Sequence, residues 1–274
     1  MRLLWGQVVK VMSRCVRVLQ LLVAICFVIL ILMRPSVCFA DEARTQHFES
    51  YVGLDYAQRA ASAFNTTFWS PFGSVSNEGF RLRVDSITNL SGETNTAVFS
   101  SAFLPKDVTM VSSLMAGYQF EYSQIWIKAF AGAAYSGDVK LFYRTLHESQ
   151  AQQWGAKAAL DAWYRVNSRV WVSASVNYLQ IGKSASLYSK SAYEVWKGER
   201  LVVALGGEAS AGLGEQRFFE AGRRLNAFGD YFRGGGLVNI HYGSHDVSLS
   251  GGMSGNSDES RLRPYVTLNY GRKF

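Results

Sequence analysis

Apolar and polar residues alternate along most of the chain from Phe48 onward. In the first alternating segment, Val52 and Leu54 share one face and Asp55 lies on the other. A period of two residues is typical of a β-strand that presents one face to an apolar environment and the other to a polar one. Segments of about 8 to 13 residues repeat this pattern to the end of the chain, separated by turn residues. The pattern therefore predicts an all-β protein with many strands.

The number of segments favours a transmembrane antiparallel up-and-down β-barrel. Including short segments at residues 62–69 and 94–101, we count about 14 strands, or about 12 when the two weakest are merged. An even number places both termini on one side of the membrane. With 14 strands, the turns at residues 167–168, 197–198 and 243–246 fall on that side. A soluble β-sandwich would also alternate, but 25 glycines and 14% aromatic residues favour the barrel.

Charged residues inside the predicted strands fall on the face opposite the aliphatic residues. Leu82, for example, lies between Arg81 and Arg83. A lipid-facing Arg or Lys would cost about 2–4 kcal/mol at the middle of a bilayer, so we expect these charges to face the lumen and to pair there. The predicted lumen network consists of Arg81, Arg83, Asp85, Lys157, Asp161, Arg165, Glu208, Arg223 and Arg224.

This network has two interpretations. The first is a set of structural ion pairs that fills a narrow barrel, and the second is a selective pore or ligand groove. We favour the first interpretation, because charges that point into a narrow lumen stabilise the barrel only when they are paired.

The N-terminal residues predict a secretory signal peptide. Residues 1–17 carry four basic residues and no acidic one, and residues 18–33 are almost entirely apolar. Small residues at Cys38 and Ala40 then suit cleavage before Asp41. The apolar run is short for a membrane-spanning helix, so an uncleaved inner-membrane anchor is the alternative. We therefore expect residues 1–40 to be a signal peptide and residues 41–274 to form the barrel.

Removal of this signal changes the charge and the cysteine content. Five of the 28 basic residues and none of the 21 acidic residues precede Asp41, so the net charge of the remaining chain is +2 instead of +7. Nucleic-acid binding thereby loses its main support. Cys15, Cys26 and Cys38 are also in the signal, and the exported chain therefore has no cysteine for a disulfide.

The sequence holds no local catalytic or metal-binding motif. His241 and His245 are four residues apart, but that spacing in a β-hairpin is not a metal-binding face. Neither HExxH nor GxSxG occurs, and no glycine-rich phosphate loop precedes a helix. A Ser, His and Asp could still meet on a barrel wall, as in outer-membrane lipid hydrolases. We predict a protein that is not an enzyme and that uses no cofactor or metal.

The last strand resembles the closing strand of bacterial outer-membrane barrels. Val266, Leu268, Tyr270 and the terminal Phe274 share one face of this segment. In those barrels the terminal aromatic residue is recognised by the assembly machinery, so the resemblance implies that role for these four residues. Arg272 departs from the pattern, because family members usually carry an apolar residue there.

Several segments together resemble the family of cellulose biosynthesis protein BcsS. They are NEGFRLRVDS (77–86), LMAGYQF (114–120), IWIKAFAGAAY (125–135), LGGEASAG (205–212), RRLNAF (223–228) and RPYVTLNYGRKF (263–274). The resemblance implies an exported alphaproteobacterial outer-membrane barrel associated with cellulose-synthesis genes. Gly206-Gly207-Glu208 stands where the family tends to have Gly-Pro-Glu. Arg83, Glu208 and Arg224 are the positions most worth testing, and we expect Arg83 to pair with Glu208.

These observations predict a non-enzymatic outer-membrane barrel that assists the export or surface organisation of cellulose or a related exopolysaccharide. The expected partners are outer-membrane lipid, the barrel-assembly machinery, and the polysaccharide or other secretion components. The alternative is a small general barrel, porin-like or adhesive, with no link to cellulose. A lipid-modifying barrel enzyme is a third class.

Overall fold

The computed structural model describes residues 45–57, 60–91, 107–142, 145–148, 152–214, 218–220, 223–225, 231–256 and 259–274. All described residues belong to one compact unit, Thr45–Phe274. The predicted signal peptide and its cleavage before Asp41 therefore lie outside the described residues. Over the described ranges, no helix is long and apolar enough to cross a membrane.

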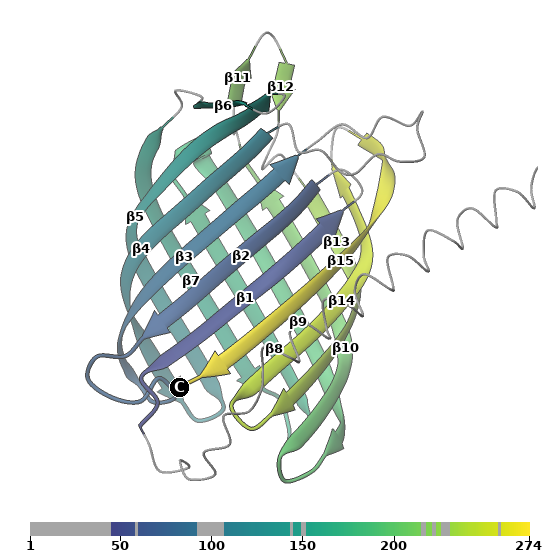
Figure 1. Ribbon diagram of the computed structural model, residues 1–274. Coiled ribbons are helices and arrows are strands. Elements are labelled where there is room, and N and C mark those ends of the chain that lie inside the picture. The colour runs from purple at the N-terminus through teal and green to yellow at the C-terminus, as the bar shows by residue number, and fades with distance from the viewer. Residues whose placement is uncertain are drawn as a thin grey trace, which may run out of the picture. The chain divides into compact units, whose positions relative to one another are not determined.

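Twelve antiparallel strands close into a barrel, because β1 pairs with β15 and every other ring strand pairs with its neighbours (Figure 1). The ring strands are β1 (Phe48–Ala57), β2 (Ala60–Trp69), β3 (Gly79–Ser91), β4 (Asp107–Tyr122), β5 (Ile125–Phe142), β7 (Gln153–Arg165), β8 (Val170–Leu179), β9 (Ser184–Lys197), β10 (Leu201–Leu213), β13 (Tyr231–Tyr242), β14 (His245–Asn256) and β15 (Glu259–Lys273). The predicted all-β up-and-down barrel is confirmed, at the lower of the two strand counts.

Three short strands and one helical turn lie outside the ring. β6 (Thr145–Glu148) pairs only with the end of β5, and β11 (Phe218–Glu220) pairs with β12 (Arg223–Leu225) in a separate sheet. A 3-10 turn, η1 (Ile181–Lys183), connects β8 to β9. Residues 139–148 therefore form the end of β5 plus β6 and not a ring strand of their own, and the short segment at residues 94–101 lies outside the described ranges. This explains why 14 was too high a count.

Both termini of the barrel lie at one end, which we call the terminal end. There Glu49, near the start of β1, pairs with Lys273 at the end of β15 (Figure 1). The turns after β4, β7, β9 and β13 lie at this end, in agreement with the predicted side for residues 167–168, 197–198 and 243–246. These turns are short. The exception is the connection between β2 and β3, residues 70–78, which we call the inturned segment.

The outward face of the barrel is apolar and is edged by aromatic rings. Leu54, Leu268 and Leu249 are adjacent in register on β1, β15 and β14, and β1 exposes Val52 and Leu54 outward. At the terminal end, Phe48 stacks with Trp69 and with Phe274, at centroid distances of 6.1 and 5.6 Å. An aliphatic band with aromatic edges is the surface that a lipid bilayer requires. The predicted alternation of outward aliphatic and inward polar residues is confirmed.

We expect a charge in this band to destabilise the barrel according to depth. Leu114 is midway along β4 and 60% exposed, so Leu114→Arg should cost about 2–4 kcal/mol of unfolding free energy in lipid vesicles. The matched control is Tyr122→Arg, which changes an 80% exposed outward residue at the end of the same strand and should cost about 0–1 kcal/mol. Equal costs in urea titrations would contradict a membrane-embedded outward face.

Candidate functional site

The lumen is the candidate site, because the inward positions carry the charges. On β3, Arg81, Arg83 and Asp85 are buried, while the intervening Val84 is half exposed. β7 continues the pattern, with Lys157 buried and Leu160 exposed. Alternation therefore delivers ionic side chains from separate strands into one enclosed space.

A central network joins β3 to β7. Arg83 donates from Nε to Asp85 at 2.7 Å and from its terminal nitrogen to Asp161 at 2.7 Å. Lys157 donates to the second Asp85 oxygen at 2.5 Å and to Ser113 at 3.2 Å. The network thus pairs two cations with two carboxylates. Each buried charge has an opposite partner, which is the condition under which a buried ion pair is tolerated.

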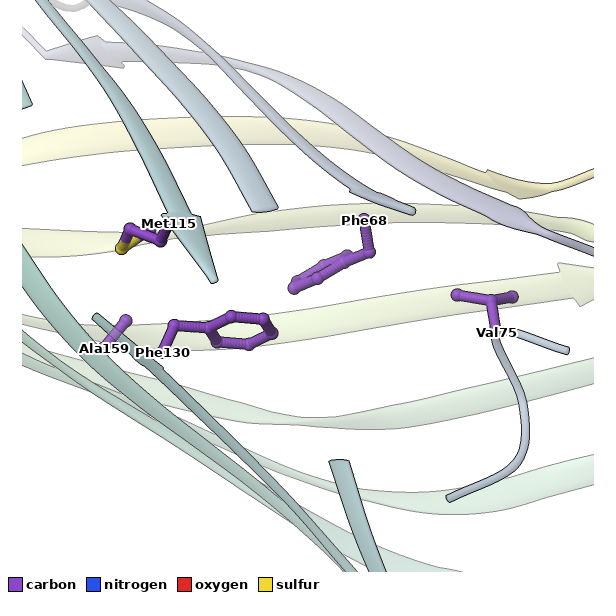
Figure 2. Close-up of a cluster of buried hydrophobic side chains, with 5 residues drawn as sticks. All are labelled: Phe68, Val75, Met115, Phe130 and Ala159. Carbon is purple, nitrogen blue, oxygen red and sulfur yellow. The ribbon is translucent and has the colours of Figure 1, made fainter. Parts of the chain in front are cut away.

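Apolar side chains fill the lumen beside this network. Phe68, Val75, Met115, Phe130 and Ala159 form one buried cluster (Figure 2). The Arg83 guanidinium carbon lies 5.3 and 5.5 Å from the centroids of the Phe68 and Phe130 rings. Cation–π contact in a desolvated setting adds to the ionic stabilisation of Arg83. The wall from β2 to β7 is therefore packed inward like a protein core.

The opposite wall holds a second group of charges with tyrosine partners. Glu208 on β10 accepts hydrogen bonds from Tyr188 at 2.5 Å and from Tyr265 at 2.9 Å. Arg233 on β13 donates to Asp55 at 2.8 Å, and Thr267 also donates to Asp55. The Arg233 guanidinium lies 4.7 Å from the centroid of the Tyr265 ring. Carboxylates on this wall are thus satisfied by hydroxyl and guanidinium donors.

Two inward glycines, Gly235 and Gly252, lie on the strands that the Tyr265 side chain crosses. Tyr265 starts on β15 and reaches Glu208 on β10, so its side chain must pass over β14 and β13. A Cβ at Gly235 would lie 2.7 Å from the Tyr265 hydroxyl oxygen and 2.3 Å from the Gly251 carbonyl oxygen. At Gly252 a Cβ would lie 2.1 Å from the Gly234 carbonyl oxygen. Gly235 therefore leaves room for the Tyr265 hydroxyl that bonds to Glu208, whereas Gly252 allows the β13 backbone to approach β14 closely.

The inturned segment enters the lumen at the terminal end and is held by Arg81. Val75, only 1% exposed, belongs to the apolar cluster of Figure 2, and its amide donates to the Gln46 carbonyl at 2.7 Å. Arg81 donates to Ser70 Oγ at 2.8 Å, and to the carbonyl oxygens of Phe80, Ser74 and Asn77. A buried cation therefore folds a nine-residue loop inward.

Two further ion pairs lie toward the terminal end. Glu49 accepts from Lys128 at 2.8 Å and from Tyr51 at 2.8 Å, and Lys128 also lies 4.4 Å from the Phe68 ring centroid. On the next wall, Arg165 donates to Glu194 at 2.9 Å. These contacts connect the apolar cluster to the rim of the barrel.

Seven of the nine predicted network residues lie on ring strands, in four groups. Arg83, Asp85, Lys157 and Asp161 meet in the central network, and Arg81 holds the inturned segment. Arg165 lies at the terminal end and Glu208 on the opposite wall. The expected Arg83–Glu208 pair is wrong, because Arg83 bonds to Asp85 and Asp161 and Glu208 bonds to two tyrosines. Arg223 and Arg224 lie on β12, outside the ring sheet, and their expected place in the lumen network stays a prediction.

Sequence reasoning missed several ionic residues of the lumen. Lys128, Arg233, Glu194, Glu49 and Asp55 are not in the predicted network, although the alternation places Asp55 on the polar face of the first segment. Strand parity was the available signal, since all five lie on the inward face of their strands.

The four residues of the expected assembly signal lie on the outward face of β15. Val266, Leu268 and Tyr270 pair in register with Tyr56, Leu54 and Val52 of β1. Phe274 exchanges two backbone hydrogen bonds with Phe48, at 2.8 and 2.9 Å. The closing seam of the barrel is therefore complete up to its last residue.

The part of the chain that the structure describes contains no group of three His, Cys, Asp or Glu side chains arranged to hold a metal ion. The lumen carboxylates are instead bonded to cationic side chains and to hydroxyl groups. This arrangement stabilises a packed interior.

The sequence matches the family described as cellulose biosynthesis protein BcsS over residues 50–273, which is nearly the whole barrel. The chain belongs to the BcsS family. This confirms the resemblance found in the sequence. The sequence of this BcsS-family chain matches no curated protein.

Solved structures share the barrel fold with this BcsS-family chain. LpxR from Salmonella typhimurium matches with a TM-score of 0.51 at 7% identity, over 82% of this chain and 100% of its own. A KdgM porin in complex with disordered oligogalacturonate gives 0.45 at 9% identity, over 82% and 99%. An outer membrane channel from Pseudomonas putida F1 gives 0.45 at 9% identity, over 86% and 100%. At these identities the likeness concerns the fold alone.

Proposed function

We propose that this BcsS-family chain is a non-enzymatic outer-membrane barrel that assists the export or surface organisation of cellulose or a related exopolysaccharide. The family match supports the link to cellulose. The apolar outward band with its aromatic edge at the terminal end supports insertion in a membrane.

The packing of side chains inside the barrel is the observation that supports the proposed mode of action. Inward side chains on opposite walls are buried, including Met115 on β4 and Thr267 on β15. Trp171 packs from β8 against Ala192 and Leu237. A barrel filled by paired charges and aromatic rings supports a scaffold that does not conduct, rather than a pore through which a glucan chain passes.

The expected partners follow from this location. Outer-membrane lipid covers the outward band, and the barrel-assembly machinery recognises the closing strand that ends at Phe274. The exopolysaccharide or another secretion component then meets the barrel at its ends.

Deletion of the gene in its host tests the link to cellulose. Cellulase-sensitive glucan on the cell surface should fall, while glucan synthesis by isolated inner membranes stays at the parent level, and the parent gene should restore the surface glucan. Unchanged surface glucan would contradict the cellulose role and favour a general barrel.

The purified protein in planar lipid bilayers tests the mode of action separately. We expect no steady ion conductance, because paired charges and aromatic rings pack inside the barrel. A stable open conductance would favour the porin-like alternative. Release of fatty acid from membrane lipid by the purified barrel would instead favour a lipid-modifying enzyme.

A further inference from the structure

One part of the outward face is polar. Ser50 on β1 and Thr67 on β2 lie 3.0 Å apart between their hydroxyl oxygens, and Thr67 donates to Asn65 Oδ1 at 3.1 Å. Val52 and Val84, the neighbours of this chain of hydrogen bonds, point outward and are half exposed. The polar chain therefore lies on the surface that faces lipid.

Asn65 lies near the middle of the apolar band. It precedes Trp69, which marks the aromatic edge at the terminal end, by four residues on β2. Four residues span about 13 Å along a strand. With the tilt usual for such barrels, this is about 10 Å along the barrel axis, in an apolar band about 25 Å tall.

The carboxamide of Asn65 is only half satisfied at this depth. Its Oδ1 accepts from Thr67, whereas its Nδ2 has no acceptor among the residues that the structure describes, and the side chain is exposed. Hydrocarbon offers no hydrogen-bond partner, so an amide donor exposed to lipid carries its full desolvation cost. A polar partner within the membrane would remove this cost.

The surroundings of Asn65 permit close approach of a second protein surface. The outward residues that precede it on β2 are Ala61 and Ala63, and its register neighbour on β3 is Ser86. We call the outward residues Ser50, Ala63, Asn65, Thr67 and Ser86 the β2 patch. Small residues that let backbones approach, together with polar residues that bond across, are the composition of interfaces inside membranes.

We propose that the β2 patch is the interface between two copies of this chain. A carboxamide is both donor and acceptor, so Asn65 is complementary to Asn65 of a second copy across a twofold axis. The β2 patch carries no charge, so it would not attract a charged partner, and a second uncharged β2 patch suits it. Such a dimer requires only a barrel that spans the membrane. The dimer proposal therefore does not depend on the proposed role in cellulose export.

Cysteine cross-linking in native membranes tests this interface. The cysteines of the chain are Cys15, Cys26 and Cys38, so a cysteine introduced into the barrel is the only one there. With a copper-phenanthroline oxidant, Asn65→Cys should give a disulfide-linked dimer, and the parent protein should give none. The control Leu205→Cys changes an exposed outward residue on β10, across the ring, and should stay monomeric.

A second variant distinguishes a dimer held by the Asn65 hydrogen bond from random encounters of two barrels that the oxidant cross-links. Asn65→Val should weaken dimerisation in detergent by about 3- to 30-fold, since one hydrogen bond between polar side chains in a membrane is worth that factor. The variant monomer should fold as well as the parent, because it removes a polar group from lipid. Equal cross-linking at both cysteine positions, a cross-link to a different protein, or an unchanged dimer constant for Asn65→Val would overturn the proposal.

Discussion

Asp85→Ala is expected to lower the free energy of unfolding by about 3–5 kcal/mol. Asp85 bonds to both Arg83 and Lys157 inside the lumen, at 2.7 and 2.5 Å. Its removal leaves Lys157 buried without a carboxylate, although Arg83 keeps Asp161. The measurement is a urea titration of the barrel refolded in lipid vesicles.

A double-mutant cycle identifies the cause of this loss. Asp85→Ala combined with Lys157→Met should cost less than Asp85→Ala alone, because the buried cation is removed with its partner. Lys197→Ala is the matched control, since Lys197 is 50% exposed beside Glu194 and its loss should cost at most about 0.5 kcal/mol. A coupling of zero between Asp85 and Lys157 would reject the central network as a stabilising unit.

Arg81→Ala should release the inturned segment and leave the ring intact. The Arg81 guanidinium donates to Ser70 and to three backbone carbonyls, and charged hydrogen bonds are worth about 1.5–3 kcal/mol each. Loss of only two of the four bonds, at the lower value of about 1.5 kcal/mol each, already corresponds to about 100-fold faster opening. We therefore expect the Val75 amide, which donates to Gln46, to exchange its hydrogen about 100-fold faster.

Glu78→Gln provides the control on the same segment. Glu78 is exposed and accepts only a 3.2 Å bond from Tyr118, so its variant should exchange at Val75 like the parent. Slow exchange at Val75 in Arg81→Ala would show that apolar packing alone holds the segment inside the lumen.

Strand parity is the part of this structure that the sequence predicts well. The face of a residue in a strand depends only on its position in the alternation, so Arg83 and Leu82 could be assigned to opposite faces from local sequence. The strand count was less certain, because a short extended segment such as β6 alternates like a ring strand but pairs with only one neighbour.

Partners across the lumen could not be predicted. Arg83 on β3 meets Asp161 on β7 because β4 and β5 lie between them in a fixed register, and that register depends on the turns and the stagger of the whole ring. Resemblance between segments pointed to Glu208 instead. The sign of the charge and the strand face limit which residues can pair. The strand register of the closed ring then decides which of these residues come within bonding distance.

The inward path of the inturned segment could not be predicted from the sequence either. Residues 70–78 contain Pro71 and Gly73 and are typical of an exposed turn. Their inward path depends on Arg81 and on the apolar cluster that contains Phe68 and Phe130, and these three residues come from three different strands. Similarly, Gly235 suggests weak strand pairing until the course of the Tyr265 side chain beside it is known.

The seam between β1 and β15 has a consequence for the timing of assembly. Every other pair of adjacent ring strands is connected directly along the chain, whereas Phe48 and Phe274 are separated by almost the whole barrel sequence. Contacts between distant residues form late, because loop closure must precede them. The ring therefore cannot close until its last residue has been delivered, and two open strand edges persist until then. A chain in this state needs protection from edge-to-edge aggregation throughout its passage to the membrane.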